Sequence, residues 1–206
     1  MNVKKKIYSI WLQNEIEKIK ASGVRPRLLL HACCAPCSSY VLEYLSPVFD
    51  ITLYYYNPNI TPKEENDFRA EELGRLCDEM PLCKVPEIIV ETYEPERFYE
   101  AVKGMESMPE GETRCSVCCR LRLEKTAQKA KELGVDYFTT TLTTSSRKDE
   151  KLLNTMGKEL AEKYGVAYLF SDFKKNNGNK RSCELTEEYN LYRQDYCGCE
   201  FSRANK

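Results

Sequence analysis

Several features that would direct a function are scarce or missing in this sequence. The 206 residues contain one histidine, one tryptophan and nine glycines. No apolar run approaches the length of a membrane-spanning helix, so a membrane protein is not expected. The basic residues after Met1 are followed by polar residues such as Gln13 and Asn14, and a secretory signal would have an apolar stretch there. We therefore expect a cytoplasmic protein.

Charge and glycine patterns narrow the function further. The formal net charge is −1, so the chain as a whole does not attract nucleic acid, and such a partner would need a local basic patch. The glycines form neither a Gly-x-Gly-x-x-Gly motif nor a Walker loop, which argues against dinucleotide and P-loop chemistry. The content of 42% hydrophobic and 31% charged residues is typical of a folded globular domain.

Strand-like apolar runs alternate with helix-like segments along the chain. We predict strands at 27–31, 51–56, 87–93, 137–142 and 166–170. We predict helices at 3–21, 38–45, 61–80, 96–104, 116–133, 149–164 and 184–196, with loops at 105–114 and 173–180. The alternation predicts an α/β fold of the HUP or Rossmann-like kind, with a mainly parallel sheet of about five strands and helices on both faces. We expect one domain over 1–206, with an N-terminal helix in 1–24 and a C-terminal helical segment in 172–206.

Ligands of such folds bind beyond the carboxyl ends of the strands. Polar residues follow four of the predicted strands, and they would meet at this edge together with the first cysteine loop. They are His31, Asn57, Thr143 and Asp172. His31, the single histidine, is equally consistent with a structural role and with a catalytic one.

Cysteine is abundant, with eleven residues, and the number is odd. Clusters of neighbouring cysteines in a reducing compartment indicate metal or redox chemistry before structural disulfides. Cys33-Cys34 and Cys115-x-x-Cys118 each precede or begin a predicted helix, where the helix dipole favours thiolate over thiol. Pro36 indicates the turn that Cys33 and Cys34 need in order to face one side. We predict that Cys33, Cys34, Cys115 and Cys118 form a four-thiolate metal site.

The other cysteines have several interpretations. Cys37 and Cys119 are either further ligands or packing residues. We interpret Cys77 and Cys83, and less directly Cys183, as small core residues. A disulfide across Cys197-Gly198-Cys199 would close a strained ring, a poor structural link but a suitable two-electron carrier; a zinc knuckle or a plain loop is the alternative.

Basic residues near these loops would form a local patch around the site, although each alone is typical of a solvated surface. They are Arg120, Arg147, Lys148, Lys174, Lys175, Lys180 and Arg181.

Five motifs together resemble the epoxyqueuosine reductases of the QueH type. They are His31-Ala32-Cys33-Cys34-Ala35-Pro36-Cys37-Ser38, Glu112-x-Arg114-Cys115-x-x-Cys118, Thr140-Thr141-Leu142 with Ser145 and Lys148, Asp172-Phe173-Lys174-Lys175, and Tyr192-Arg193-Gln194-x-Tyr196-Cys197-Gly198-Cys199. The resemblance runs from about Leu28 to Ser202.

This resemblance implies an iron–sulfur oxidoreductase that reduces epoxyqueuosine to queuosine at the wobble position of tRNA, without cobalamin. It implies a 4Fe–4S cluster on Cys33, Cys34, Cys115 and Cys118, and a redox-active pair formed by Cys197 and Cys199. A second, mononuclear metal ion would have Cys37, Cys119 or Asp172 as candidate ligands. Asp172, Tyr192 or Tyr196 would supply a proton, and Tyr56 or Tyr192 would stack on the base. The expected partners are the tRNA anticodon loop and an external electron donor.

Three other functions stay open at this point. A zinc-stabilised tRNA-binding module would have the thiols and no redox activity. An ATP-dependent enzyme that modifies a tRNA base on a related α/β fold would need a glycine-rich phosphate loop after the first strand, where this chain has Ala32–Ser38. A thioredoxin-like dithiol oxidoreductase would work without metal.

Overall fold

The computed structural model describes residues 7–203 and contains one five-stranded sheet. All strand pairs are parallel, and the strand order is β3-β2-β1-β4-β5. The strands are β1 (Arg27–His31), β2 (Asp50–Tyr55), β3 (Glu87–Val90), β4 (Tyr137–Thr140) and β5 (Ala167–Tyr168). This 3-2-1-4-5 order is that of doubly wound Rossmann-like folds. The predicted fold class, including its five parallel strands, is confirmed.

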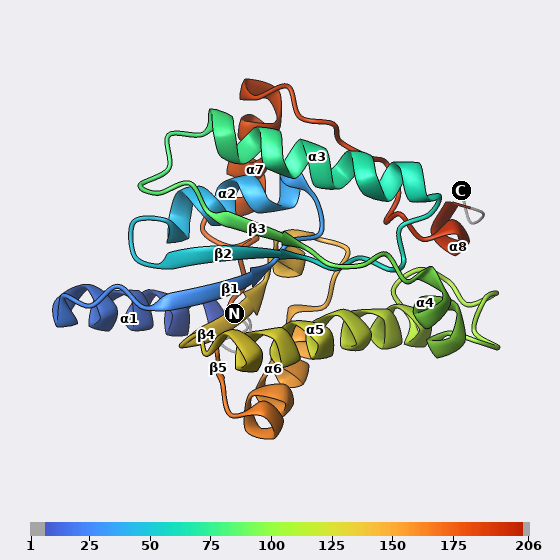
Figure 1. Ribbon diagram of the computed structural model, residues 1–206, viewed down its shortest axis with the longest axis horizontal. Helices are drawn as coiled ribbons and strands as arrows, with labels where there is room; N and C mark the ends of the chain where they lie inside the picture. Colours follow the sequence, from blue (N-terminus) through green and yellow to red (C-terminus); the bar gives the residue numbers. More distant parts are fainter. Residues whose placement is uncertain (1–6, 204–206) are drawn as a thin grey trace, which may run out of the picture.

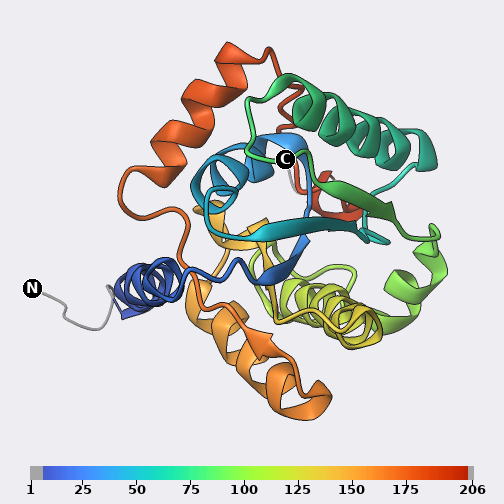
Figure 2. The same cartoon turned by 60° about the vertical axis from the view of Figure 1, so that its left-hand side comes forward.

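The core has two parts, one on each face of the sheet, because successive side chains of a strand point to opposite faces. Leu28 and Leu30 of β1 pack with α1 (Ile7–Ser22), α2 (Ala35–Leu45) and α3 (Lys63–Glu79). Leu29 packs with α5 (Thr113–Leu133) and α6 (Glu150–Tyr164). Figure 1 shows α2 and α3 above the sheet and α5 and α6 below it, and Figure 2 shows the same two layers from another side.

Shorter elements surround the carboxyl edge of the sheet. They are α4 (Pro95–Ala101), the 3₁₀ helix η2 (Thr141–Thr144), α7 (Gly178–Glu188) and α8 (Glu200–Arg203). The amino-terminal ends of α3 and α5 also lie on this side, at the right of Figure 1, where α4 and α8 cover them. Helix amino termini and strand carboxyl ends thus meet where doubly wound folds bind their ligands.

Several predicted elements differ in extent from the observed ones, most of them by three residues or fewer at either end. The fourth strand ends at Thr140, two residues earlier than predicted, because the Thr140 side chain accepts a hydrogen bond from the Leu142 amide and begins η2. The last helix spans Gly178–Glu188, not 184–196, so residues predicted as loop are helical and residues 189–199 have no regular structure. The first predicted helix is present as α1, and its predicted residues 3–6 lie outside the described part. Within residues 7–203, no helix combines the length and apolarity that crossing a membrane requires.

Candidate metal and redox site

Three thiols from the β1–α2 connection and the first turn of α2 lie together at the carboxyl edge of the sheet. The sulfurs of Cys33, Cys34 and Cys37 all lie within 4.8 Å of one another, and those of Cys33 and Cys34 are 3.8 Å apart. Cys34 is the N-cap of α2, Pro36 lies in its first turn, and the predicted turn therefore brings neighbouring cysteines to one side. These thiols line a cavity of about 390 Å³. Cys37, whose role the sequence left open, faces the same group.

Ionisation within this group favours one thiolate. Hydrogen bonds from the Cys34 and Cys37 thiols hold the pKa of Cys33 well below its usual range. The Thr141 hydroxyl also donates to the Cys33 sulfur, at 3.4 Å. The same interaction with Cys33 raises the pKa of Cys34 to about 12 and raises that of Cys37 well above its usual range. The group thus contains one anionic sulfur, that of Cys33. Binding of a metal would deprotonate the other two thiols as well, because cysteine binds metals as thiolate.

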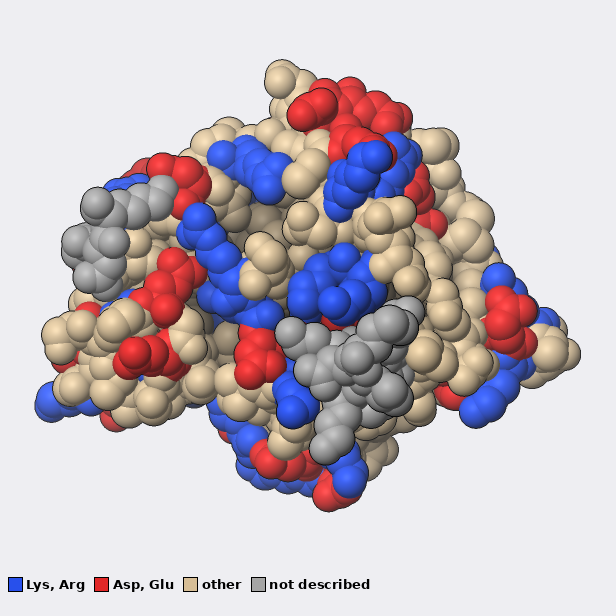
Figure 3. All heavy atoms as spheres, turned by 180° about the vertical axis from the view of Figure 1, so that it is seen from behind, with Lys and Arg blue, Asp and Glu red and all other residues tan. Residues whose placement is uncertain are grey.

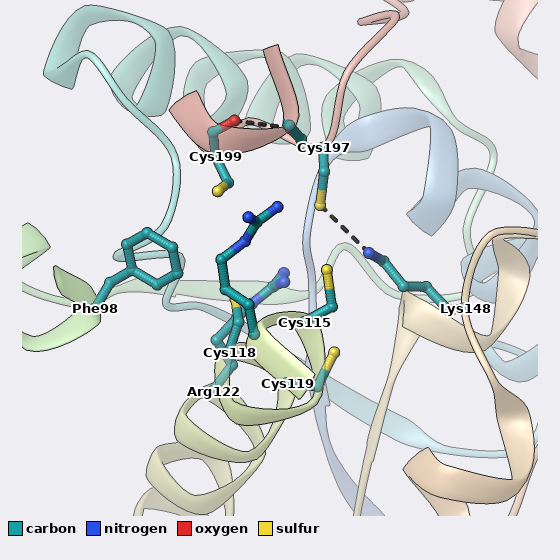
Figure 4. Close-up of a pocket in the computed structure, with 10 residues that line it drawn as sticks. Phe98, Cys115, Cys118, Cys119, Arg122, Lys148, Cys197 and Cys199 are labelled. Carbon is teal, nitrogen blue, oxygen red and sulfur yellow. Dashed lines mark hydrogen bonds between the residues drawn. The ribbon is translucent and has the colours of Figure 1, made fainter. Parts of the chain in front are cut away.

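A second group of thiols lines a smaller neighbouring cavity of about 20 Å³ (Figure 4). Its cysteines are Cys115, Cys118, Cys119, Cys197 and Cys199. The first three stand at the start of α5, and the last two come from the segment that crosses above them. The backbone amide of Gly111 donates to the Cys115 sulfur at 3.2 Å. Burial raises the pKa of Cys118, Cys119 and Cys199, so these thiols are neutral without a metal.

The two predicted ligand pairs therefore lie in two adjoining cavities. Cys33 and Cys34 form a close group with Cys37, whereas Cys115 and Cys118 lie in the smaller cavity. The linking residues, which line both cavities, are Arg122, Lys148 and Cys197. All eleven cysteines are free thiols, so Cys197 and Cys199 are present here as a dithiol. The four-ligand set and the redox pair stay predictions.

Lys148 and Arg122 line both cavities, but only Lys148 could be predicted from the sequence as a site residue. Lys148 belongs to a motif quoted above, and its Nζ lies 3.5 Å from the Cys197 sulfur and 3.8 Å from the Glu110 carboxylate. Burial lowers the pKa of Lys148, but Cys197 and the neighbouring cysteines, in their deprotonated forms, outweigh this effect, and the net shift is upward. Arg122, 2% exposed, was missed, because an arginine in a charged helical segment gives no sign that it faces inward.

Residues 189–199, which we call the C-terminal strap, lie along α3 and carry two of the thiols. Arg75 of α3 donates to the carbonyl oxygens of Tyr189 and Asn190, at 3.1 and 3.3 Å. The Arg69 guanidinium lies 5.2 Å from the centre of the Tyr196 ring. The amide of Thr61 donates to the Gly198 carbonyl at 3.0 Å.

Tyr192 and Tyr56 have partners within the protein. The Tyr192 hydroxyl lies 3.2 Å from the Glu65 carboxylate, and its ring packs edge-on against Phe68. Tyr56 is 2% exposed and packs against Tyr54 in the core. The core interpretation of Tyr56 therefore applies, and its ring is not open for stacking on a base.

Asp172 lies at the predicted edge, paired with a lysine. Its carboxylate lies 2.7 Å from Nζ of Lys174, which also contacts Glu150 at 2.7 Å. Burial raises the pKa of Asp172 although Lys174 opposes this shift. Asp172 is not among the residues that line either thiol cavity. Its predicted catalytic role stays a prediction.

The predicted basic patch is only partly free of acidic partners. Figure 3 shows lysine and arginine side chains around a hollow on one face, with acidic side chains beside them. Arg181 pairs with Glu43 at 2.6 Å, and Arg120 pairs with Glu159. Arg147 lines the large cavity and is exposed, and its guanidinium lies 3.8 Å from the Glu110 carboxylate.

Three cysteines lie away from both cavities. Cys77 is buried in the core of the α3 face, as predicted, and burial raises its pKa to about 12. Cys83 is exposed, so the prediction of a core residue is wrong; it lies in the connection between α3 and β3, beyond the core. Cys183 is half-buried, with the Arg193 guanidinium 3.0 Å from its sulfur.

The fold and the site define a Rossmann-like α/β protein with a cluster of cysteines at the carboxyl edge of its sheet. Residues 28–205 match the family model of epoxyqueuosine reductase QueH. The chain belongs to this family, and the family inferred from the sequence motifs is confirmed.

Proteins named epoxyqueuosine reductase QueH are similar to this chain over most of its length. The protein from Streptococcus pyogenes serotype M1 is 44% identical over 205 residues, which cover 98% of this chain and 80% of that protein. The Staphylococcus epidermidis protein is 42% identical over 199 residues, 95% of this chain and 84% of its own length. The Thermotoga maritima protein is 38% identical over 175 residues, 85% of this chain and 89% of its own length.

Proposed function

We propose that this protein is an iron–sulfur epoxyqueuosine reductase that converts epoxyqueuosine in tRNA to queuosine in the cytoplasm, without cobalamin. The observation that carries the proposal is the group of Cys33, Cys34 and Cys37 sulfurs within 4.8 Å, beside a cavity lined by five further thiols, in a chain of the QueH family. Eight of the eleven cysteines line the two cavities.

The donor set fits an iron–sulfur cluster, because such clusters are held by cysteine thiolates. We assign Cys33, Cys34, Cys115 and Cys118 as its ligands. When bound, the cluster would supply electrons and a Lewis-acidic iron to the epoxide oxygen. Cys37 and Cys119 remain beside these ligands as candidate ligands of a second metal ion.

The Cys197 and Cys199 thiols can supply the electrons and protons that the reaction consumes. Removing the epoxide oxygen as water leaves an alkene and consumes two electrons and two protons. Oxidation of the Cys197 and Cys199 thiols to a disulfide releases two electrons and two protons. An external reductant then returns the pair to the dithiol. Both thiols line the smaller cavity, and Cys197 also lines the larger one, where a substrate would enter.

The larger cavity suits a single extruded nucleoside. Its volume is about 390 Å³, and its lining includes Arg69, Arg147, Arg193 and Gln194 beside the thiols. A base in an anticodon loop is already single-stranded, so little pairing energy opposes its entry. The exposed Arg147 and the half-buried Lys175 would contact phosphates of the tRNA backbone.

The decisive experiment is incubation of epoxyqueuosine-containing tRNA with anaerobically reconstituted protein and a strong reductant. Mass analysis of the nucleosides should show loss of one oxygen from the modified base, with the cluster-free protein as control. Absence of conversion by protein with full iron and sulfide content would contradict the proposal.

A zinc-stabilised tRNA-binding module is the second candidate, and one distance favours it. Two sulfurs bound to a single tetrahedral ion with bonds of about 2.3 Å would be about 3.8 Å apart, and the Cys33 and Cys34 sulfurs have that separation, 3.8 Å. Metal analysis separates the two functions. Colourless protein with stoichiometric zinc and no sulfide would favour the binding module.

A further inference from the structure

Three arginine side chains are almost completely buried in this protein, and two of them have conventional partners. Arg69 is 2% exposed and pairs with the Glu65 carboxylate at 2.7 Å. Arg114 is 1% exposed and donates to backbone carbonyl oxygens, among them that of Glu106 at 2.7 Å. Such acceptors offset the large cost of removing a guanidinium from water.

Arg122 lacks this kind of partner. Its side chain is 2% exposed, and its Nη2 donates to Oδ1 of Asn57 at 2.5 Å. Its Nε has no hydrogen-bond partner, and within residues 7–203 no carboxylate lies at ion-pair distance from it. One neutral amide oxygen does not balance a buried positive charge.

Sulfur atoms surround this charge. Arg122 lines both cavities, the larger one together with the Cys33 group and the smaller one together with the α5 thiols. Burial lowers the pKa of Arg122, but Cys118, Cys33 and neighbouring cysteines, in their deprotonated forms, raise it by more, and the net shift is upward. The groups beside this cation that can carry negative charge, as thiolates or as ligands of a metal, are therefore cysteines of the two cavities.

We propose that Arg122 is the counter-charge of the metal–thiolate centre, and that it both retains the centre and raises its reduction potential. The inference rests on the proposed function, in which cysteines of both cavities hold an iron–sulfur cluster. A centre with four thiolates becomes more negative when it is reduced, and a fixed positive charge in a water-excluded site favours that reduced state. Arg122 acts through the centre, so it is a positioning residue.

Two substitutions separate the charge of Arg122 from its hydrogen bond. Arg122→Gln removes the charge and keeps an amide donor for Asn57, whereas Arg122→Lys keeps the charge. In a redox titration followed by electron paramagnetic resonance, Arg122→Gln should shift the midpoint potential of the cluster to more negative values, and Arg122→Lys should remain closer to wild type. Loss of the cluster to an iron chelator should be about 10- to 100-fold faster in Arg122→Gln.

Arg147→Gln is the matched control. It removes the same charge from the same cavity, but the Arg147 side chain is 60% exposed, so solvent screens it. We expect the midpoint potential of this variant to match that of wild type.

A second measurement uses the cluster-free protein. Without the cluster, the Arg122 guanidinium keeps the Asn57 amide oxygen as a neutral hydrogen-bond partner and an Nε without one, so Arg122→Gln should unfold at the same denaturant concentration as wild type or a higher one. A cluster-free Arg122→Gln protein that fails to fold or unfolds earlier, or a loaded one with the wild-type potential, overturns the inference. A wild-type protein that assembles no cluster contradicts the proposed function instead, so the two failures are distinguishable.

Discussion

The imidazole Nδ1 of His31 lies 2.9 Å from the hydroxyl oxygen of Thr140, and its Nε2 lies 3.2 Å from the carbonyl oxygen of Tyr56. A carbonyl only accepts hydrogen bonds, so Nε2 carries the proton and Nδ1 accepts from the Thr140 hydroxyl. The neutral ring thus fixes the turn that also carries Thr141, whose hydroxyl donates to the Cys33 sulfur. His31 thus stabilises the backbone that positions the thiol site. This favours the structural role for His31 over the catalytic one.

This buried histidine makes the stability of the protein dependent on pH. Burial and the Arg122 charge lower the pKa of His31 to about 3, whereas the unfolded chain has a histidine pKa of about 6.5. Below about pH 6.5 the unfolded state binds a proton that the folded state does not bind until about pH 3. We therefore expect His31 to lower the free energy of unfolding by about 1.4 kcal/mol for each unit by which the pH decreases, between about pH 5.5 and about pH 4.

The measurement is urea unfolding of wild type and His31→Gln across this pH range. Glutamine keeps a donor and an acceptor but does not titrate, so the decline in acid should be shallower by about one proton. At neutral pH the variant should be less stable by about 1–3 kcal/mol, because its hydrogen bonds have poorer geometry. Parallel pH profiles for the two proteins would show that His31 is not the group that titrates.

The sheet was predictable because its signals are local. Runs such as Leu28–Leu30 and Ile51–Tyr55 are apolar, rich in β-formers and bounded by turn residues, and helical segments separate them. Parallel pairing follows from that alternation without knowledge of any long-range contact.

The last helix was misplaced because distant residues set its two ends. At its start, a Cβ on Gly178 would lie 2.4 Å from the Tyr40 ring, so only glycine allows this close approach to α2. At its end, Arg75 of α3 donates to the carbonyls of Tyr189 and Asn190, and Asn190 has a φ of 46°. Neither Tyr40 nor Arg75 is a neighbour in sequence, so no local pattern shows these limits.

The cysteine loops were predictable, but their grouping was not. Adjacent cysteines followed by Pro36 indicated a turn into a helix, and the structure has one. That Cys37 joins Cys33 and Cys34 depends on the path of the turn. That Arg122 faces the thiols depends on the rotation of α5 against the sheet, which no spacing in the sequence reports.

Gly198 gives the C-terminal strap a backbone conformation that residues with a side chain rarely adopt. Its φ is 100°, and a Cβ there would lie 2.8 Å from Cγ1 of Ile60 and 3.0 Å from Nη1 of Arg69. Gly198→Ala should therefore displace both thiols of the strap, lower stability by about 1–3 kcal/mol and reduce turnover while the iron content stays at the wild-type level. Gly23→Ala is the control, because its φ is 67° but nothing lies within 4 Å of the new Cβ. Wild-type turnover in Gly198→Ala would refute the role of the strap.

The predicted ligand set is tested by serine replacements of single cysteines. Cys33→Ser, Cys34→Ser, Cys115→Ser and Cys118→Ser should each lose cluster absorbance and iron after anaerobic reconstitution, because serine is a poor iron–sulfur ligand. Cys37→Ser is the informative comparison, since Cys37 lies within 4.8 Å of the first two sulfurs and outside the predicted set. Full iron content in Cys115→Ser together with loss in Cys37→Ser would replace the predicted set by one built on the α2 loop.

The redox pair is tested by Cys199→Ser. A disulfide needs both sulfurs, so this variant should bind the cluster at the wild-type level yet lose catalytic turnover, because the two electrons of the dithiol are no longer available. After one turnover without added reductant, alkylation should find two fewer free thiols in wild type and no change in the variant. Cys83→Ser is the matched control, since Cys83 is exposed and lies away from both cavities. If Cys199→Ser turns over like wild type, the electrons reach the epoxide without this pair, and Cys197 and Cys199 serve only to close the cavity.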